Sequence, residues 1–183
     1  MIEDAVRALR RPGGVVVYPT ETLYGIGGRA DDARAAHRVG EIKGRGLQPL
    51  IVLVDEIPND LEGLALELAQ AFWPGPLTII VPAPDWVCAE VCGPDRTVGL
   101  RWGGHPVVSQ LIAEVGPITS TSANLTGQAP PRRAEEVVLE VDAVVDGGEL
   151  PQAMASTLVH VATRRLLRRG ELAEQVERFL ESG

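Results

Sequence analysis

Short apolar runs rich in β-branched residues alternate along the chain with stretches whose apolar residues recur at helical spacing, and this alternation constrains the fold most strongly. We predict strands at residues 15–18, 50–54, 78–81, 97–102, 118–121, 143–145, 157–161 and near 166–167. We expect helices from Asp31 or Asp32 to about residue 42, from Asn59 or Asp60 to residue 72, after Pro106, over 134–140, and from Glu171 onwards. The pattern predicts an α/β (α+β) architecture with several helices packed on a mixed sheet.

The organisation of the chain indicates a single domain over residues 1–183. No internal repeat, interdomain linker or heptad pattern interrupts it, and this length is enough to bury a sizeable core. The first residues are acidic, and no apolar stretch approaches the roughly 18 residues that a membrane span needs. We therefore expect a cytoplasmic protein with no membrane partner.

The charge balance bears on nucleic-acid binding. A protein that binds nucleic acid over most of its surface is usually basic, so the net charge of −8 argues against extensive RNA binding. Four arginines within six positions could still form a local basic patch: Arg164, Arg165, Arg168 and Arg169.

The cysteines and histidines do not form a metal-binding pattern. Cys88 and Cys92 lie four positions apart, and the three histidines, His37, His105 and His160, are scattered. No metal site formed by the protein is therefore predicted. Reduced thiols are the expected state of the cysteines, with a local disulfide or a redox role as the alternative, and His105 and His160 are expected to be structural or exposed.

Lys43 is the only lysine among the 17 basic residues. A lysine offers a compact, hydrated point charge that a planar guanidinium does not reproduce, so its retention in an arginine-rich chain indicates a role. Arg45 follows it across one glycine, and a lysine and an arginine so arranged can address neighbouring phosphates. The alternative is a basic helix C-terminus stabilised by the helix dipole.

Two further polar segments follow predicted strands, where α/β folds commonly present ligand-binding groups. Residues 119–124 combine four consecutive hydroxyls with the amide of Asn124, a donor set suited to phosphate oxygens. Residues 19–27 combine hydroxyls, a carboxylate, an aromatic ring and glycines. A solvated loop and an ordinary turn are the respective alternatives. Standard P-loop, dinucleotide-binding and hydrolase signatures are absent.

Nine segments follow one another along nearly the whole chain: PTETLYGIG at 19–27, KGR at 43–45, PLIVLV at 49–54, FWPGPLTIIVPA at 72–83, VGLRW at 98–102, TSANLTG at 121–127, DGG at 146–148, STLV at 156–159 and LRRG at 167–170. Together they resemble the YrdC-like family of L-threonylcarbamoyladenylate synthases, and the paired KxR and SxN motifs are the most specific. The resemblance implies a twisted open mixed sheet with helices and a concave basic cleft.

The resemblance also implies an activity and site residues. L-threonine, bicarbonate and ATP, the last with Mg²⁺, would condense into threonylcarbamoyl-AMP and pyrophosphate, and a separate tRNA threonylcarbamoyl transferase complex would use the product. Lys43 and Arg45 would be the catalytic cations. The residues that would contact ATP are Lys43, Arg45, Thr97, Ser122, Asn124 and Arg168. Those that would contact threonine are Thr20, Tyr24, Arg101, Ser120 and Ser156, with Arg101 as the partner of its carboxylate.

One segment departs from the family pattern KxRPxxxPL. Residues 43–50 lack the first proline and are one residue shorter, so this loop is expected to cover ATP differently. Two other functions stay open: an RNA-binding or ribosome-maturation module of the same fold, with weak RNA binding, and a paralogue that acts on a different carbamoyl acceptor. The aromatic content of 4% disfavours the RNA module, because single-strand binding uses stacking platforms.

Overall fold

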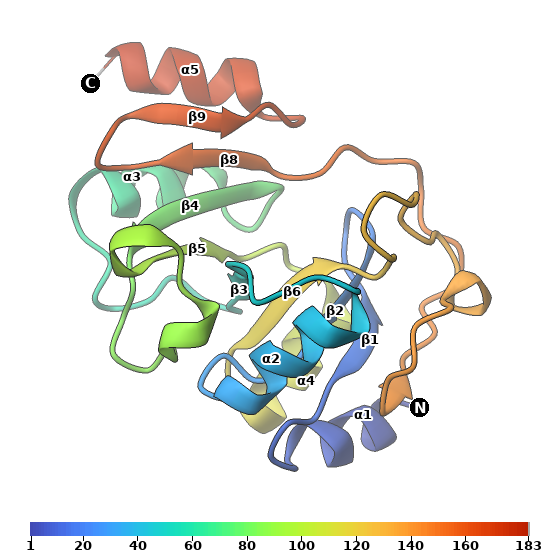
Figure 1. Ribbon diagram of the computed structural model, residues 1–183. Coiled ribbons are helices and arrows are strands. Elements are labelled where there is room, and N and C mark those ends of the chain that lie inside the picture. Colours follow the sequence, from blue (N-terminus) through green and yellow to red (C-terminus); the bar gives the residue numbers. More distant parts are fainter. Residues whose placement is uncertain (183) are drawn as a thin grey trace.

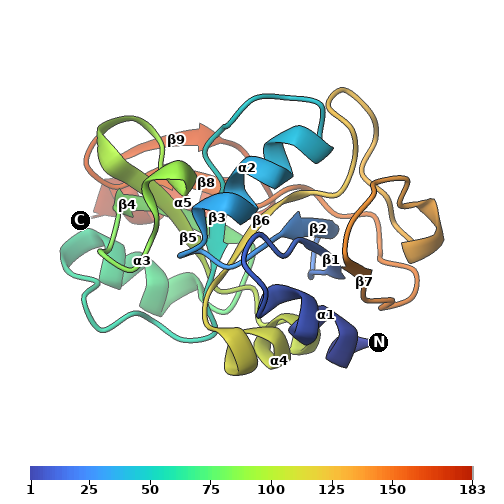
Figure 2. The ribbon, with the colours of Figure 1, turned by 60° about the horizontal axis from the view of Figure 1, so that its bottom comes forward.

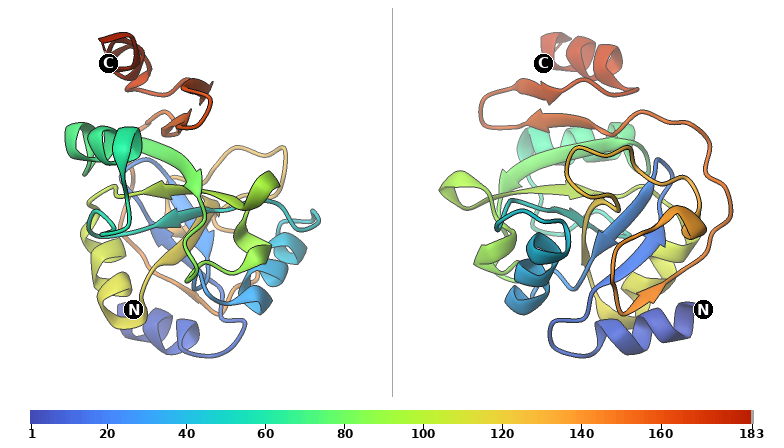
Figure 3. Two further views of the ribbon diagram at one scale, coloured as in Figure 1. Left: turned by 90° about the vertical axis from the view of Figure 1, so that its left-hand side faces the viewer. Right: turned by 45° about the vertical axis from the view of Figure 1, so that its right-hand side comes forward.

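A computed structural model describes residues 1–182 and contains one nine-stranded mixed sheet (Figure 1). The strand order is β7-β1-β2-β6-β3-β5-β4-β8-β9. The strands are β1 (Val16–Pro19), β2 (Tyr24–Gly27), β3 (Ile51–Leu53), β4 (Leu77–Pro82), β5 (Thr97–Arg101), β6 (Ile118–Ser122), β7 (Ala143–Val144), β8 (Thr157–His160) and β9 (Arg165–Arg168). The predicted architecture is confirmed: the sheet is open and twisted (Figure 3), with β1–β7, β3–β5 and β4–β8 parallel and the other pairs antiparallel.

Five helices cover the sheet. They are α1 (Ile2–Leu9), α2 (Ala33–Ile42), α3 (Gly63–Phe72), α4 (Pro106–Val115) and α5 (Ala173–Ser182), joined by the short 3₁₀ turns η1 (Ala89–Val91), η2 (Pro94–Arg96) and η3 (Ala134–Glu136). Helices α1 and α4 pack side by side (Figure 2). None of the helices within residues 1–182 is both long enough and apolar enough to cross a membrane.

The two cores follow from the alternation of side chains along each strand. On β1, Val16 and Tyr18 point into the core under α1 and α4, whereas Val17 points into the larger core that contains residues of α2, α3 and α5. On β3, Val52 and Leu53 divide in the same way. The helices therefore lie on both faces of the sheet. We call the face that α1 and α4 cover the first face.

Most predicted elements are present with bounds shifted by a residue or two, as helix and strand ends commonly are. The predicted N-cap Asp32 is confirmed, because its Oδ1 accepts hydrogen bonds from the amides of Arg34 (2.9 Å) and Ala35 (3.2 Å). Helix α1 and strand β2 are absent from the sequence prediction, which assigned residues 24–27 to a polar loop.

Two predicted helices differ from the structure. Helix α3 begins at Gly63 rather than at residue 59 or 60, because a turn closed by the bond from Leu61 N to Pro58 O (3.1 Å) precedes it; Leu61 reaches the core from that turn. The helix predicted over 134–140 is only the single turn η3. The β-branched Val137 and Val138 follow it, and such side chains lower helix propensity.

Candidate functional site

The first face of the sheet is covered by helices over only part of its area. Along β6, Ile118 lies beneath α4, and Ser120 and Ser122 point to the same side farther along the strand. Cross-strand pairing places four residues in one row beyond the helices: Ile80, Gly99, Ile51 and Ser120. This row is part of the lining of a cavity of about 400 Å³.

Hydroxyl groups and guanidinium groups line this cavity, which we call the cleft. They come from the β1–β2 turn, the loop after α2, strands β5 and β6, the segment before β8, and β9. The polar lining residues are Thr22, Arg45, Arg101, Ser120, Thr121, Ser122, Ser156 and Arg168. Six of them are residues that the sequence analysis selected: Arg45, Arg101, Ser120, Ser122, Ser156 and Arg168.

Arg101 is the most buried cation of the cleft, with only 8% of its side chain exposed. Its Nη2 donates to the Glu21 carboxylate and to the Thr22 hydroxyl, the latter at 3.0 Å. Within residues 1–182, the buried Nε of Arg101 has no hydrogen-bond partner. A buried guanidinium N–H without an acceptor is costly, so this atom is suited to an anionic ligand.

Arg168 lies opposite, on β9, and is held by Ser156. Its Nε donates to the Ser156 carbonyl and its Nη2 to the Ser156 hydroxyl, both at 2.9 Å, and that hydroxyl also bonds to Thr78 Oγ1 at 2.7 Å. Partial burial and the charge of Arg101 both lower the pKa of Arg168. The two guanidinium groups therefore repel each other across the cleft, and an anion between them would relieve that repulsion.

Arg45 provides the third cation of the cleft, from the loop after α2. Its Nη2 lies 3.5 Å from Thr121 Oγ1, and its buried Nε has no partner among the described residues. Burial lowers the pKa of this guanidinium. Three guanidinium groups thus converge, and Glu21 is the carboxylate that forms an ion pair with one of them. The cleft carries a net positive charge and favours a polyanionic ligand.

Lys43 lies behind the wall of the cleft rather than among the lining residues. It is 2% exposed, and its Nζ donates to the carbonyls of Ser122 and Asn124, the latter at 2.6 Å. Its own carbonyl accepts from Thr126 Oγ1 at 3.3 Å. Burial, together with the charge of Arg45, lowers the pKa of the Lys43 ammonium to about 8. In this structure Lys43 therefore joins the two loops that were expected to bind phosphates.

Four other selected residues are also not among the lining residues of the cleft. Thr20 closes the β1–β2 turn, because its hydroxyl donates to Leu23 O at 2.7 Å. Asn124 Nδ2 donates to the carbonyls of residues 125 and 128. Thr97 Oγ1 donates to Pro94 O at 2.9 Å.

Tyr24 is fully buried beneath the DGG segment at 146–148. Its hydroxyl donates to Gly148 O at 2.8 Å and accepts from Gly147 N at 2.9 Å. The contacts of these four residues shape the loops around the cleft, and their roles toward ligands stay predictions.

Three residues at the cleft were missed by the sequence analysis. Thr22, Thr121 and Glu21 all lie in the segments that it singled out, but nothing in their spacing marks them individually. A signal for Thr22 is available once β2 is recognised, because a tight turn between β1 and β2 brings residues 20–23 to the strand ends.

The structure provides little for a metal ion. Among residues 1–182, no three or more His, Cys, Asp or Glu side chains gather as a candidate metal site. Cys88 and Cys92 are free thiols, and partial burial raises the pKa of both. The donors in the cleft are cationic or hydroxylic, and the Glu21 carboxylate is engaged by Arg101. Such a set does not fit a protein-held divalent cation.

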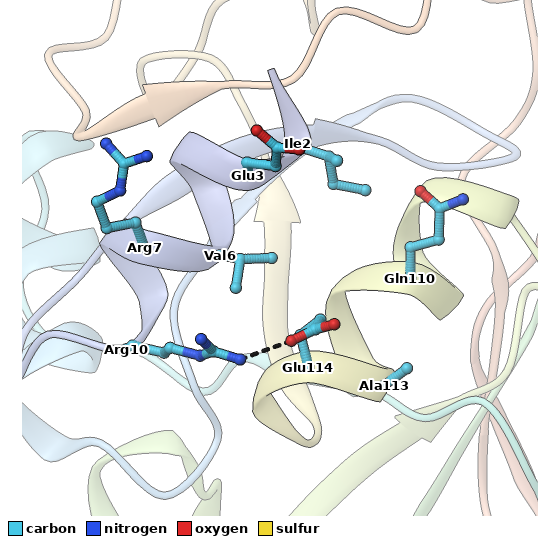
Figure 4. A pocket seen from close by; sticks show the side chains of 8 residues that line it. All are labelled: Ile2, Glu3, Val6, Arg7, Arg10, Gln110, Ala113 and Glu114. Carbon is cyan, nitrogen blue, oxygen red and sulfur yellow. Dashed lines mark hydrogen bonds and ion pairs between the residues drawn. The ribbon is translucent and has the colours of Figure 1, made fainter.

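A second hollow of about 550 Å³ lies between α1 and α4 on the outer surface (Figure 4). It is lined by Ile2, Glu3, Val6, Arg7, Arg10, Gln110, Ala113 and Glu114, and an ion pair of 2.6 Å joins Arg10 to Glu114 at one end. None of the residues selected from the sequence lies there. The hollow carries charges of both signs, so it lacks the convergence of cations that distinguishes the cleft.

The profile of the Sua5/YciO/YrdC family, described as "Telomere recombination", matches residues 8–170. The chain belongs to this family. A Bacillus subtilis member named threonylcarbamoyl-AMP synthase is 40% identical to this chain over an alignment of 186 positions. The alignment covers 93% of this chain and 54% of that protein. A Mycobacterium tuberculosis member is 39% identical over an alignment of 191 positions, which covers 95% of this chain and 86% of that protein.

Family structures also match the fold. The Pyrococcus abyssi Sua5 structure complexed with L-threonine has a TM-score of 0.81 to this chain and 34% identity, covering 96% of this chain and 56% of that one. The chain thus spans about half the length of the Bacillus and Pyrococcus members that it matches.

Proposed function

We propose that the chain is a threonylcarbamoyl-AMP synthase, which condenses L-threonine, bicarbonate and ATP and releases pyrophosphate. The observation that carries this proposal is the convergence of Arg45, Arg101 and Arg168 in one hydroxyl-lined cleft. A family member named threonylcarbamoyl-AMP synthase supports the reaction, and the Sua5 structure with bound L-threonine supports threonine as one substrate.

The chemistry needs alignment and charge stabilisation more than a dedicated base. The amine of threonine attacks bicarbonate, and loss of water leaves an N-linked carbamate. A carbamate oxygen then attacks the α-phosphorus of ATP, forming the mixed anhydride as the bond to pyrophosphate breaks. Negative charge moves onto the leaving pyrophosphate, so positioned cations stabilise the transition state.

The residues of the cleft divide between the two substrates in this proposal. Arg101 receives the threonine carboxylate, with Ser120 and Ser156 beside it, and Arg45 and Arg168 receive the ATP phosphates. Lys43 holds the end of β6 at Ser122 and the loop that follows it, and joins the phosphate site if ATP displaces its two carbonyl partners. Thr20, Tyr24, Thr97 and Asn124 act by shaping the surrounding loops.

Mg²⁺ would arrive with ATP, held by phosphate oxygens and water, since the cleft offers no free carboxylate set among the described residues. No step of the proposal depends on a protein-bound metal. The product, a reactive mixed anhydride, would pass to a tRNA-modifying transferase complex in the cytoplasm.

The experiment is pyrophosphate release by the purified chain, measured with each of threonine, bicarbonate and ATP omitted in turn. Release should require all three, and release that ignored threonine would refute the proposal. Arg45→Met and Arg168→Met should lower the rate at least ten-fold by removing charge-assisted bonds to phosphate. The matched control is Arg178→Met, at an exposed arginine of α5.

The arginine cluster at 164–169 gives the RNA-binding alternative little support. Arg164 Nη2 donates to Leu180 O at 2.9 Å, Arg169 pairs with Glu177, and Arg168 lines the cleft. Most of the cluster is therefore engaged within the chain. Salt-dependent RNA binding without threonine-dependent pyrophosphate release would favour the alternative.

A further inference from the structure

Glu21 lies in the turn between β1 and β2 and forms an ion pair with Arg101. The same nitrogen, Arg101 Nη2, also donates to the hydroxyl of the next residue, Thr22, at 3.0 Å. Two consecutive turn residues thus hold one end of the Arg101 guanidinium. The Arg101 side chain is 8% exposed, and its Nε has no hydrogen-bond partner among the described residues. The guanidinium is held in one orientation before any ligand binds.

The turn that carries Glu21 is itself closed by hydrogen bonds. Thr20 Oγ1 donates to Leu23 O at 2.7 Å and accepts from the amides of Thr22 (3.3 Å) and Leu23 (3.2 Å). These bonds fix the backbone on both sides of Glu21. The carboxylate is therefore delivered by a rigid support, not by a mobile loop.

The segment after β5 provides the space into which this carboxylate fits. A Cβ at Gly103 would lie 2.2 to 2.4 Å from all three carboxylate atoms of Glu21, which is far inside any allowed contact. The strand end around it is held by the bonds from Val54 N to Arg101 O (3.0 Å) and from Gly75 N to Trp102 O (2.8 Å). A side chain at position 103 would therefore displace the Glu21 carboxylate from its place beside Arg101.

We propose that Glu21 is a positioning residue that holds Arg101 ready for the carboxylate of the amino-acid substrate. In this proposal, Gly103 leaves the space that the Glu21 carboxylate occupies beside Arg101. The proposal rests on the proposed function for the identity of the substrate. A buried guanidinium without a counter-charge is unstable, and Glu21 supplies that charge while leaving Nε free. Pre-organisation of this kind lowers the cost of binding the substrate.

The test compares Glu21→Gln and Gly103→Ala with two controls, Glu56→Gln at an exposed carboxylate and Gly93→Ala, whose Cβ would meet its nearest neighbour at an ordinary 3.4 Å. The KM for L-threonine should rise about ten-fold in both test variants, with the KM for ATP unchanged, because a charge-assisted contact is weakened on the threonine side alone. The preference for L-threonine over threoninol, which lacks the carboxylate, should fall by a similar factor.

A second measurement reads the geometry without substrate. Phenylglyoxal modifies accessible guanidinium groups, and peptide mapping reports the rate at Arg101. This rate should be low in the parent chain and should rise in Glu21→Gln, with circular dichroism confirming that the variant is folded. Unchanged modification, an unchanged KM for threonine, or tighter threonine binding would overturn the proposal. Tighter binding would mean that Glu21 competes with the substrate for Arg101.

The two measurements separate this proposal from the proposed function. If the parent chain released no threonine-dependent pyrophosphate, the proposed function would fail. The modification rate at Arg101 would still decide whether Glu21 positions it. If Gly103→Ala did not fold, Glu21→Gln alone would decide.

Discussion

The buried ammonium of Lys43 should make the stability of the protein rise with pH above neutrality. Burial and the neighbouring charge of Arg45 place its pKa at about 8 in the folded chain, below the ordinary value near 10.5. Between these two values the unfolded chain binds more protons than the folded chain. The free energy of unfolding therefore increases as pH rises from about 8 towards 10.5.

The magnitude follows from the two pKa values. Proton linkage at Lys43 should raise the free energy of unfolding by about 2 kcal/mol between pH 7 and pH 9.5. With a urea m-value of about 2 kcal/mol/M, this corresponds to a midpoint shift of about 1 M. The assay is urea unfolding of the parent and of Lys43→Met at pH 7, 8, 9 and 9.5. Other titrating groups are shared by the two proteins, so they cancel in the difference.

The hydrogen bonds of Lys43 act on its pKa in the opposite direction to burial. Its ammonium donates to two backbone carbonyls, and such bonds favour the charged form and oppose the effect of burial. If the difference between parent and Lys43→Met stayed flat up to pH 9.5, the carbonyls would outweigh burial. The ammonium would then keep its ordinary pKa, contrary to the prediction.

Substitutions at Lys43, Tyr24 and Gly99 test three contacts of the structure. Lys43→Arg should lose most pyrophosphate release at pH 7, because a planar guanidinium does not fit between two carbonyls; a near-parental rate would refute the special role of lysine. Tyr24→Phe should lower the free energy of unfolding by about 1 to 2 kcal/mol, as measured in urea, because two hydrogen bonds to residues 147–148 are lost. Gly99→Ala should cost about 1 to 3 kcal/mol, since its Cβ would lie 2.8 Å from Thr78 Cγ2; unchanged thermal stability would show that Thr78 yields freely.

The elements that the sequence predicts well are those whose packing is periodic and local. Strand β3 is a continuous apolar run, and α2 has both an N-cap and an apolar face, so each is evident without tertiary contacts. Strand β2 is different, because its sequence YGIG has two glycines. Gly27 is required by the fold: a Cβ there would lie 1.7 Å from Thr119 O on the neighbouring strand. Such close backbone approach is not visible in a single sequence.

In the candidate site, too, the residue types could be predicted from the sequence, but the contacts between distant residues could not. The three arginines of the cleft could be selected from the sequence, because their segments carry recognisable motifs. The place of Lys43 outside the cleft lining could not be predicted from the sequence. Its partners are backbone carbonyls about 80 residues later in the chain, and a backbone carbonyl does not depend on residue type. The pairing of Glu21 with Arg101 is equally distant in sequence and depends on the space at Gly103.

The position of the cleft follows from a local break in the pattern that builds the core. In β6 the positions on the first face read Ile118, Ser120, Ser122. Ile118 packs under α4, but the hydroxyls of Ser120 and Ser122 give a helix little apolar surface to cover, and Gly99, in the same row as Ser120, gives none. That part of the face therefore stays open while the same strands remain rigid through the covered part. Arg101, the last residue of β5, is carried by one of these rigid strands, and such support favours a fixed orientation toward an anionic ligand.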